Sequence, residues 1–547
     1  MTSPSPELCP TPPDWPHCGH SEDPSTDPVG CRGILIPGQT VCLAHLEDAD
    51  RAAYLGNLSP GADINHRGTP FTTDLLSELL AALTDSATGR PCLGEAIFEQ
   101  ATFSDDAVFD GAAFAGGAWF KGAEFDGNAV FGGVKFSAEA SFLGAKFSRG
   151  AWFGGAEFHG DTWFGATEFR GNVVFLKAAF ERAAVVGPLA CTGTLDLSEA
   201  VFGSAVTIEA AAGAVNCRRT RWVSTAALRL RHAVVNLSDA VLEHPVSIAA
   251  HSRPFTANGK EMAEPGSLTG PGVRVVSLRG VDAAHLVLTD LDLTNCRFAG
   301  TIHLDQLRLE GLYTLAVTPS GLRRCGVWPV RWTPRRTLAE EHHWRATRFK
   351  GADGWAPPLK GDEVLKPAAL APVYRQLRKS FEDGKHEPGA ADFYYGEMEM
   401  RRHADDIPWA ERSLLTTYWA LSGYGQRASR ALIWLLATMT ATVLAMMLWG
   451  LPRYAPKATS TATLTGTRSI TITTYTPDPV NPNGPYHQRL STERFEKSLR
   501  VVINSVVFRS SGQDLTTAGT YTEMFARLTE PVLLGLAVLA IRNRVKR

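Results

Sequence analysis

Phenylalanine recurs between residues 98 and 180 with a spacing that neither an α-helix nor a β-strand produces. Sixteen phenylalanines stand there, and the steps between them alternate between five and six residues without an error, from Phe98 to Phe180. Two residues before each one lies a small or short side chain, most often alanine, as at Ala96 and Ala118. Helical faces recur about every 3.6 residues and strand faces about every 2. A fixed repeat of one large and one small apolar residue instead predicts a coil whose turns stack and bury each other's side chains.

With four sides in each turn of the coil, this spacing would place each phenylalanine above the phenylalanine of the turn before. Steps of five, six, five and six residues make a turn of 22 residues, and stacked turns rise by about 4.8 Å each. We therefore expect Phe120, Phe125, Phe131 and Phe136 on four successive sides of one turn, with Phe142 directly above Phe120. The two extra residues of each turn would form bulges, stacked on opposite sides.

The stretches AEFDGNAVF, AKFSRGAWF and AEFHGDTWF resemble the phenylalanine-centred repeats of pentapeptide-repeat proteins. That resemblance implies a mainly β fold, a right-handed, four-sided β-helix whose large and small repeat residues point inward. It covers residues 96–182 closely and returns at 278–312. Some soluble members of the family mimic DNA and bind topoisomerases, which requires a strongly acidic face. Residues 96–182 hold 11 acidic and 7 basic side chains spread over all sides, so we expect neither that role nor a nucleic-acid partner.

The segments around the regular repeat predict other elements. Residues 71–84 carry apolar side chains at helical spacing behind Thr73, the expected N-cap of a helix that caps the solenoid. After residue 182 apolar pairs continue but the period is lost, with a loop at 251–273, so we expect an irregular coil to about Leu312. Residues 372–402 predict two helices around Gly384. A similar helical hairpin before a membrane span occurs in many bacterial pentapeptide-repeat membrane proteins.

Two apolar stretches near the C-terminus predict a transmembrane hairpin. The stretch 431–452 has 22 residues without a charge, and a helix of that length covers about 33 Å, enough to cross a bilayer. A second span at about 524–541 is shorter and ends in the basic tail 542–547. The alternatives are a buried core helix for the first stretch and an interfacial helix for the second.

The N-terminus lacks the basic and apolar regions of a cleavable signal peptide. With its two predicted spans, the chain is expected to be a multi-pass protein of the cell membrane. Because a large N-terminal domain without an export signal is expected to stay in the cytosol, the N-terminal domain and the C-terminal tail would both lie there. The loop 453–523 would lie outside.

Cysteine and histidine cluster in the proline-rich segment before residue 50. The candidate ligands are Cys18, Cys31, Cys42 and His45. Together they form a Cys3His set, with a C-x2-H pair at its end, that suits a tetrahedral, structural Zn²⁺ ion. His20 and Cys9 are competing ligands, and the simpler alternative is a group of separate cytosolic thiols. The nine cysteines of the chain are widely spaced, which favours a reducing compartment over a disulfide framework.

Motifs of enzyme active sites are missing from the sequence, which has no P-loop, no dinucleotide-binding glycine motif and no G-x-S-x-G elbow. His342 and His343 lack the H-E-x-x-H spacing, and we expect them on a solvated helix face. We expect Glu382, Glu397 and Glu399 to form salt bridges on a helix surface. The protein is therefore predicted not to be an enzyme.

The loop between the predicted spans is similar to that of two-span pore-loop cation channels. A short apolar stretch, Ser498–Phe508, predicts a short helix, and the sequence TTAG at 516–519 predicts a turn before the second span. In such channels a glycine-rich turn offers backbone carbonyls to the ion. Here Thr520 and Tyr521 stand where the family has Tyr-Gly. The missing glycine favours a degenerate relic or an ordinary external loop.

These predictions divide the chain into five parts. They are a Cys/His-rich segment at 1–50, a linker and capping helix at 51–95, the β-helix at 96–312, a helical region at 313–426 and the transmembrane hairpin at 427–547. The predicted function is a membrane-anchored, non-enzymatic scaffold whose β-helix binds a protein partner. The alternative is a channel-like protein that has the β-helix as its cytosolic regulatory domain.

Overall fold

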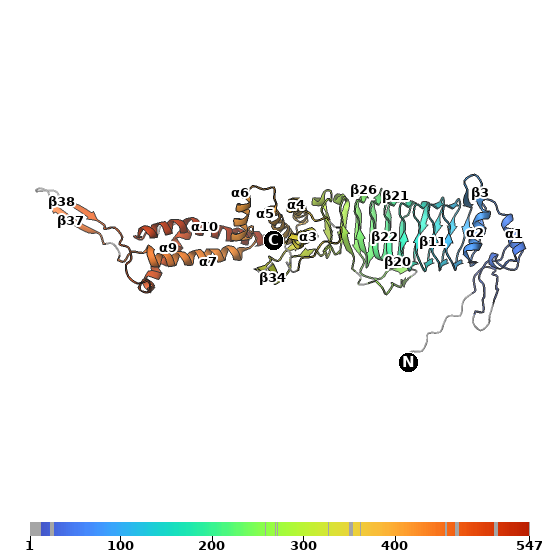
Figure 1. Ribbon diagram of the computed structural model, residues 1–547, viewed down its shortest axis with the longest axis horizontal. Coiled ribbons are helices and arrows are strands. Elements are labelled where there is room, and N and C mark those ends of the chain that lie inside the picture. Colours follow the sequence, from blue (N-terminus) through green and yellow to red (C-terminus); the bar gives the residue numbers. More distant parts are fainter. Residues whose placement is uncertain are drawn as a thin grey trace, which may run out of the picture. The chain divides into compact units, whose positions relative to one another are not determined.

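The computed structural model describes residues 12–21, 27–257, 259–268, 270, 272–325, 328–348, 354–361, 363–454, 457–464, 470–507 and 512–545. The chain forms two compact units, Met1–Phe393 and Tyr394–Arg547. Within the first unit, short strands stack in a regular series and helices follow at its C-terminal end (Figure 1). The second unit consists mainly of helices with one projecting β-hairpin (Figure 1).

The first unit is a β-solenoid of about ten turns. Each regular turn supplies one short strand to each of four parallel ladders. The turn around Phe120 comprises β9 (Ala118–Trp119), β10 (Glu124–Phe125), β11 (Ala129–Val130) and β12 (Lys135–Phe136). The preceding strands are β5 (Ala96–Ile97), β6 (Thr102–Phe103), β7 (Ala107–Val108) and β8 (Ala113–Phe114). The following ones are β13 (Ala140–Ser141), β14 (Lys146–Phe147), β15 (Ala151–Trp152), β16 (Glu157–Trp163), β17 (Thr167–Phe169), β18 (Val173–Val174) and β19 (Ala179–Arg182).

The register of these turns confirms the predicted 22-residue coil. Ala118 pairs with Ala140 one turn later, and the rings of Phe120 and Phe142 stack with centroids 5.0 Å apart and an interplanar angle of 1°. Phenylalanines of the other three ladders stack in the same way, and all of them are buried. The core is therefore four columns of stacked rings, with alanines between them. That the coil is right-handed stays a prediction.

The extra residues of most 22-residue turns lie in the corners without a register shift, so the predicted regular ladder of bulges is absent from the described turns; a shift occurs between Phe158 and Asp161, where β16 pairs with β19. Registers run without a shift through β9–β13 and β10–β14. Because the strands have only two residues each, the extra residue of a six-residue step fits into the corner between two strands, as at residues 126–128. The five-residue corners are tighter and turn through a left-handed residue, for example Gly122 at φ +65°, a conformation that glycine adopts without strain.

The solenoid begins at Ile64, earlier than the predicted boundary at residue 96. β1 (Ile64–Asn65) pairs with β5, and β2 (Pro70–Phe71) pairs with β6. Helix α2 (Thr73–Ala82) follows, and β4 (Arg90–Leu93), which also pairs with β3 (Thr84–Asp85), joins the ladder of β8. Thr72 is the N-cap of α2, because its side chain accepts the Leu75 amide at 3.3 Å. The predicted cap, Thr73, is already helical and donates its hydroxyl to Asp106 O.

Between residues 201 and 250 the solenoid keeps a regular period, which corrects the predicted loss of it. The turn shortens to 20 residues: Val201 pairs with Arg221, which pairs with Val241. The inward residues there are mixed, and Phe202 stacks on Trp222 at 4.4 Å. The strands are β20 (Val185–Asp196), β21 (Val201–Phe202), β22 (Val206–Asn216), β23 (Arg221–Trp222), β24 (Ala226–Arg231), β25 (Val234–Asn236), β26 (Val241–Leu242) and β27 (Val246–Ala250).

The predicted loop at 251–273 is an insertion within one turn. It carries the hairpin β28 (Thr256–Ala257) and β29 (Lys260–Glu261). The buried Arg231 forms two hydrogen bonds with Glu264 and so fastens the insertion to the solenoid. The coil then continues through β30 (Arg274–Ser277), β31 (Leu286–Thr289) and β32 (Arg308–Glu310), with 3₁₀ turns η2 (Ala283–His285) and η3 (Leu304–Gln306).

Short strands and three helices follow the last turn. The strand pairs are β33 (Ala316–Val317) with β36 (Arg336–Thr337) and β34 (Leu322–Cys325) with β35 (Trp328–Arg331), so the region predicted as helical contains strands as well. The helices are α3 (Ala339–Arg348), α4 (Pro367–Asp383) and α5 (Glu387–His403). Gly384 ends α4, which confirms the two helices predicted around it.

The second unit holds a three-helix bundle and a hairpin. Its elements are α6 (Trp409–Ser422), α7 (Ala428–Ala445), η4 (Met446–Gly450), β37 (Thr459–Leu464), β38 (Ile470–Tyr475), α8 (Tyr486–Arg489), α9 (Thr492–Val506) and α10 (Thr517–Val545). The TTAG sequence forms no turn, in contrast to the prediction, because α10 begins at Thr517 and includes Gly519. A Cβ on Gly519 would lie 2.3 Å from Gly450 O, so close backbone packing explains this glycine.

Candidate functional site

The Cys/His-rich segment folds into a small knuckle against the first solenoid turn. The amide of Cys18 donates to Gly33 O, and the amide of Cys31 donates to His20 O, so the two stretches run side by side. His45 comes from η1 (Leu43–His45), the 3₁₀ turn directly after Cys42. The Ile34 amide donates to Arg67 O at 2.8 Å. The knuckle is thereby joined to the backbone that precedes β2.

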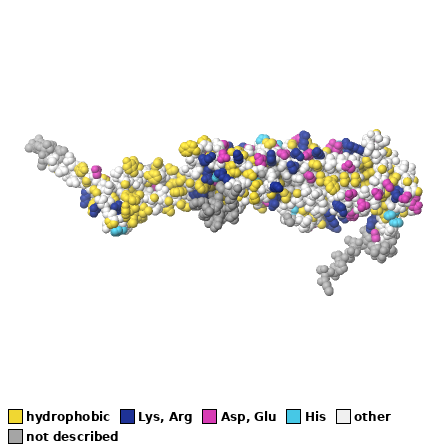
Figure 2. All heavy atoms as spheres, viewed as in Figure 1, with side chains coloured by type: hydrophobic (Ala, Val, Ile, Leu, Met, Phe, Trp, Pro, Cys, Tyr) yellow, Lys and Arg dark blue, Asp and Glu magenta, His cyan; other side chains and the backbone are white. Residues whose placement is uncertain are grey.

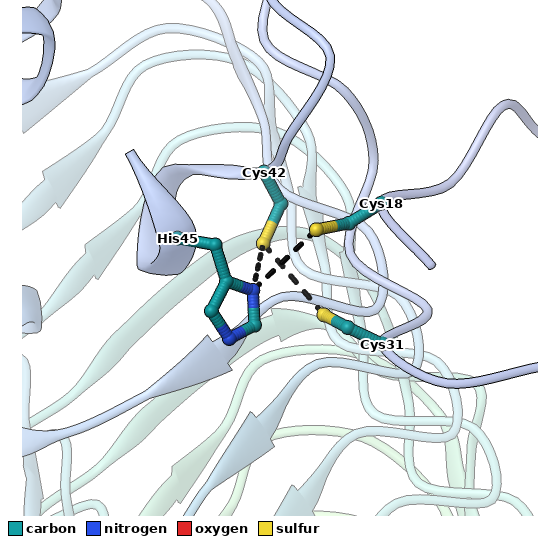
Figure 3. Close-up of side chains that lie close together, drawn as sticks. All are labelled: Cys18, Cys31, Cys42 and His45. Carbon is teal, nitrogen blue, oxygen red and sulfur yellow. Dashed lines mark hydrogen bonds between the residues drawn. The ribbon is translucent and has the colours of Figure 1, made fainter. Parts of the chain in front are cut away.

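Four side chains of this knuckle converge, and they are the predicted ligands Cys18, Cys31, Cys42 and His45 (Figure 3). Their ligand atoms all lie within 4.8 Å of one another. Cys31 Sγ and Cys42 Sγ are 3.7 Å apart, and His45 Nδ1 lies 3.4 Å from the Sγ atoms of Cys18 and Cys42. Tetrahedral Zn²⁺ with bonds of about 2.3 Å to sulfur would separate two sulfurs by about 3.8 Å. The cluster can therefore hold a metal ion of that size and geometry.

The electrostatics of the thiols agree with a ligand role. The hydrogen bond between Cys31 and Cys42 lowers the pKa of Cys31 to about 5, and the same bond together with burial raises the pKa of Cys42. A site that already stabilises one thiolate is suited to a cation. The competing ligand His20 lies outside the cluster, with its ring stacked on that of His45 at 4.1 Å. Cys9 lies outside the described residues.

Two ladders of the regular solenoid present apolar side chains outward. The residue before each phenylalanine points away from the core, although Ser141 is buried there, and on the first and third sides of each turn this residue is mostly Trp, Val or Ile. One column is Ile97, Trp119, Ser141 and Trp163, and the other is Val108, Val130, Trp152 and Val174. Trp163 is 37% exposed and Trp152 is 40% exposed. We call these columns the two apolar faces.

The alternate ladders carry charged side chains in the same outward position. Lys146 contacts Glu124 at 2.9 Å, and Lys135 contacts Glu157 at 3.0 Å, each one turn apart. Such cross-strand pairs satisfy one another within the solenoid. Figure 2 shows Lys, Arg, Asp and Glu side chains interspersed along one view of the solenoid. The sequence analysis missed this division, although the residue before each phenylalanine reveals it.

Several ionisable residues expected on a helix surface are buried. His342 is 8% exposed and forms a hydrogen bond with Thr337 at 3.0 Å, so the predicted solvated position is wrong for His342, whereas His343 is half-buried. Glu397 and Glu399 are also buried, and Glu399 bonds Arg402 and Tyr424. Glu382 is the one of the three that forms the expected exposed ion pair, with Arg378 at 3.3 Å.

The buried centre of α3 is a closed ion network. Glu341 accepts hydrogen bonds from Arg335 at 2.6 and 2.8 Å, from Arg345 at 2.6 Å and from the hydroxyl of Tyr374. Burial alone would raise the pKa of Glu341, but the two guanidinium groups outweigh it and hold that pKa well below its usual range. Removing one partner would leave a buried charge without compensation. The network ties the β36–α3 segment to α4.

Two helices of the second unit are long and apolar enough to cross a membrane. They are Ala428–Gly450, of 23 residues, and Thr517–Arg542, of 26 residues. Hydrophobic side chains cover most of the face of these helices that is seen in Figure 2. The second helix begins before the predicted boundary near residue 524 and so reaches the length that the prediction required.

Polar side chains connect α9 to both of these helices. Ser505 donates to the buried Glu530 at 2.8 Å, near the middle of α10. At the other end of α9, Arg494 donates to the carbonyls of Met447, Leu451 and Pro452 at 2.8–3.0 Å. The guanidinium therefore caps the C-terminal end of the α7–η4 helix, whose carbonyls lack helical partners.

Short strands in four in-register ladders around a phenylalanine core define the first unit as a repeat-built β-solenoid. Residues 98–145 and 120–168 match the family model described as pentapeptide repeats (9 copies). This match identifies residues 98–168 of the solenoid as pentapeptide repeats. No curated protein and no solved structure shows a match.

Proposed function

We propose that the chain is a membrane-anchored, non-enzymatic protein-interaction scaffold. The observation that carries this proposal is the pair of apolar faces, where Trp152 and Trp163 stand partly exposed on rigid ladders. Contiguous exposed apolar surface marks interaction sites, and aromatic side chains dominate binding energy there. The charges on the alternate ladders are paired within the chain. A protein partner would therefore gain more from covering an apolar face than a charged one.

The membrane anchor of this proposal is the pair of apolar helices α7–η4 and α10. Their lengths of 23 and 26 residues exceed the roughly 20 residues that a bilayer crossing needs. Both the solenoid and the C-terminal tail would face the cytosol, with the β37–β38 hairpin outside. The basic residues after Ile541 support a cytosolic tail under the positive-inside rule.

A non-enzymatic role is supported by the way buried ionisable groups are used. Glu341 is paired with both Arg335 and Arg345 within the C-terminal cap of the solenoid, so these buried charges are held in a structural ion network. The Cys3His cluster supplies four protein ligands, which fills a tetrahedral coordination sphere and suits a structural Zn²⁺ ion. That ion would order the knuckle next to the first turn, where stacked coils need a covered end.

The scaffold is tested by affinity capture with the full chain in detergent. Variants with Trp152→Ser and Trp163→Ser remove the aromatic groups of the apolar faces, and Lys135→Ser with Lys146→Ser is the matched change on the charged ladders. Protein captured by the wild type and the lysine variant, but lost with the tryptophan variant, is the expected result. Capture that is equal in all three would show that the apolar faces do not bind the partner.

The channel-like alternative keeps one specific observation in its favour. Between the two apolar helices, α9 reaches Glu530 near the middle of α10, and Thr516 then donates to Trp449 O at 2.7 Å, at the end of the first helix. A segment that packs beside the middle of one span and then comes back to the end of the other has the arrangement of a pore loop. Ion flux into liposomes that contain the full chain tests it, and flux no greater than that of protein-free liposomes would dismiss it.

A further inference from the structure

At the C-terminal end of the solenoid, no strand of the described residues pairs with the outer edge of β32. Glu340 accepts the amides of Phe298 and Ala299 at 2.6 and 2.9 Å, and Ser380 donates to Leu307 O at 2.7 Å. These contacts satisfy backbone groups on the last turn beside α3 and α4. The next residues form β32, which pairs with β31 along one edge in the register Leu288↔Leu309. Open strand edges are templates for a further strand.

The backbone of Leu309 faces away from the solenoid ladder. The Asp290 amide donates to Glu310 O, so the polar groups of Glu310 point toward β31. In a strand, the backbone groups of successive residues point to opposite edges. The N–H and C=O of Leu309 therefore point to the free edge, where the N–H can donate a hydrogen bond to an added strand and the C=O can accept one from it.

This edge borders a cavity of about 640 Å³ in the first unit. The cavity lies between residues 305–311 of the last turn and the end of α4, with Tyr313 and His386 on its wall. The rings of Tyr313, Phe381 and His386 form a cluster with centroid separations of 5.6–6.2 Å. Aromatic walls beside a strand edge suit an extended peptide, whose side chains fill pockets while its backbone pairs.

The charges around the cavity favour a basic side chain. Three carboxylates line it, from Asp305, Glu310 and Asp383, against the single guanidinium of Arg308. Asp305 is paired with Lys379 at 2.6 Å, which leaves the other two carboxylates beside the aromatic rings. Aromatic faces attract Lys and Arg cations. A Lys or Arg directly opposite Glu310 on an added strand would form a favourable cross-strand pair.

We propose that this groove binds an extended peptide segment that carries a lysine or arginine, as an added strand along β32. The proposal rests on the proposed scaffold function and names the class of partner segment, but it uses a surface separate from the two apolar faces. Backbone pairing with Leu309 supplies the alignment, and Glu310, Asp383 and the aromatic cluster select the basic side chain. Only three residues of β32 are available, so the contact is short and exchanges rapidly.

Photocrosslinking of a weakly bound peptide to the full chain in detergent tests the proposal. The probe is the peptide Thr-Val-Lys-Val-Thr with a terminal benzophenone, and mass spectrometry locates the attachment. Crosslinks are expected within residues 305–313 or 380–386. Yields are expected to fall about tenfold, the equivalent of about 1.4 kcal/mol, with glutamate in place of the lysine, or with Glu310→Gln and Asp383→Asn together. The matched control Glu382→Gln changes an exposed carboxylate that does not line the cavity.

A third peptide, methylated on alternate backbone nitrogens, separates strand addition from charge attraction. The methylated peptide keeps its lysine but cannot pair as a strand, so its crosslinks in the groove should disappear. Equal crosslink yields from the methylated and the unmethylated lysine peptide would overturn the proposal, and so would the absence of crosslinks from the unmethylated lysine peptide in the groove. Crosslinks found only around Trp152 or Trp163 would also overturn it, yet they would support the scaffold function, so the two failures are distinguishable.

Discussion

Replacing Phe131 by alanine should destabilise the centre of the solenoid strongly. Phe131 is fully buried, and its ring lies parallel to those of Phe109 and Phe153, with centroids 5.0 and 4.9 Å away. It also meets the rings of Phe120 and Phe142 edge to face at 5.6 and 5.5 Å. Phe→Ala changes in cores cost about 3–5 kcal/mol. We expect about 4 kcal/mol or more, because rigid turns above and below prevent the cavity from collapsing.

The assay is hydrogen exchange on the full chain in detergent, supported by urea denaturation. In a solenoid each turn is stabilised mainly by its neighbours. The amides that bond across this column, Phe109 to Val130 O and Phe131 to Trp152 O, should lose protection first, while the 20-residue turns change less. Trp152→Ala is the control, since its outward side chain should cost about 1 kcal/mol or less. If both variants exchanged alike, the assignment of Phe131 to a stacked core would be refuted.

Three further predictions concern the metal, the membrane and pH. The full chain should contain about one zinc per molecule, and Cys31→Ser should lose it, because three remaining ligands hold the ion less tightly. Cysteine placed at Ser460 should react with an impermeant reagent on intact cells, whereas cysteine at Asn543 should not, if the hairpin crosses twice. Burial lowers the pKa of His66 to about 4, so the unfolded chain binds its proton first. Stability from this group is present above about pH 6.5 and falls by up to about 3 kcal/mol toward pH 4, which urea denaturation at both pH values measures.

Each of these predictions has its own control and contrary result. Cys92→Ser should keep the metal, since Cys92 lies outside the cluster, and elemental analysis without zinc in fresh protein would remove the claim. Permeabilised cells should label at both introduced cysteines. Labelling at both sites on intact cells would leave a single crossing. His66→Phe should reduce the loss of stability in acid, and an unchanged acid profile would show that His66 does not titrate as described.

The sequence predicts the regular solenoid well because one residue type marks every side of the coil. Each large ring stacks on the same residue type one turn later, so the spacing alone determines the register. Beyond residue 200 the period persists, but the inward positions hold mixed residues, such as Trp222 above Phe202. A period is hard to recognise when no residue type is constant along it, which explains why the sequence predicts an irregular coil where the structure has 20-residue turns. The cap at Thr72 differs from the prediction by one residue, which is the usual precision of helix ends.

The candidate sites, too, were predictable where the local sequence shows their residues, and not where they depend on contacts between distant segments. The metal cluster was predictable because cysteine and histidine are typical metal ligands and because two of them have the C-x2-H spacing of a ligand pair. The burial of Glu341 and His342 was not, since their partners Arg335 and Tyr374 come from separate segments. The cavity at β32 likewise depends on the position of α4 against the last turn. Only the three-dimensional fold brings such groups together.

The central claim is that the apolar faces of the membrane-anchored solenoid bind a protein partner. Its most direct test is photocrosslinking in intact cells, with a photoreactive amino acid placed in turn at Trp163, Val130, Lys135 and Glu124. These positions point outward from the four ladders of the regular solenoid. The account predicts a discrete crosslinked protein from Trp163 or Val130 and none from the two charged positions. Equal crosslinking from all four positions, or a product only from Lys135 or Glu124, would contradict it.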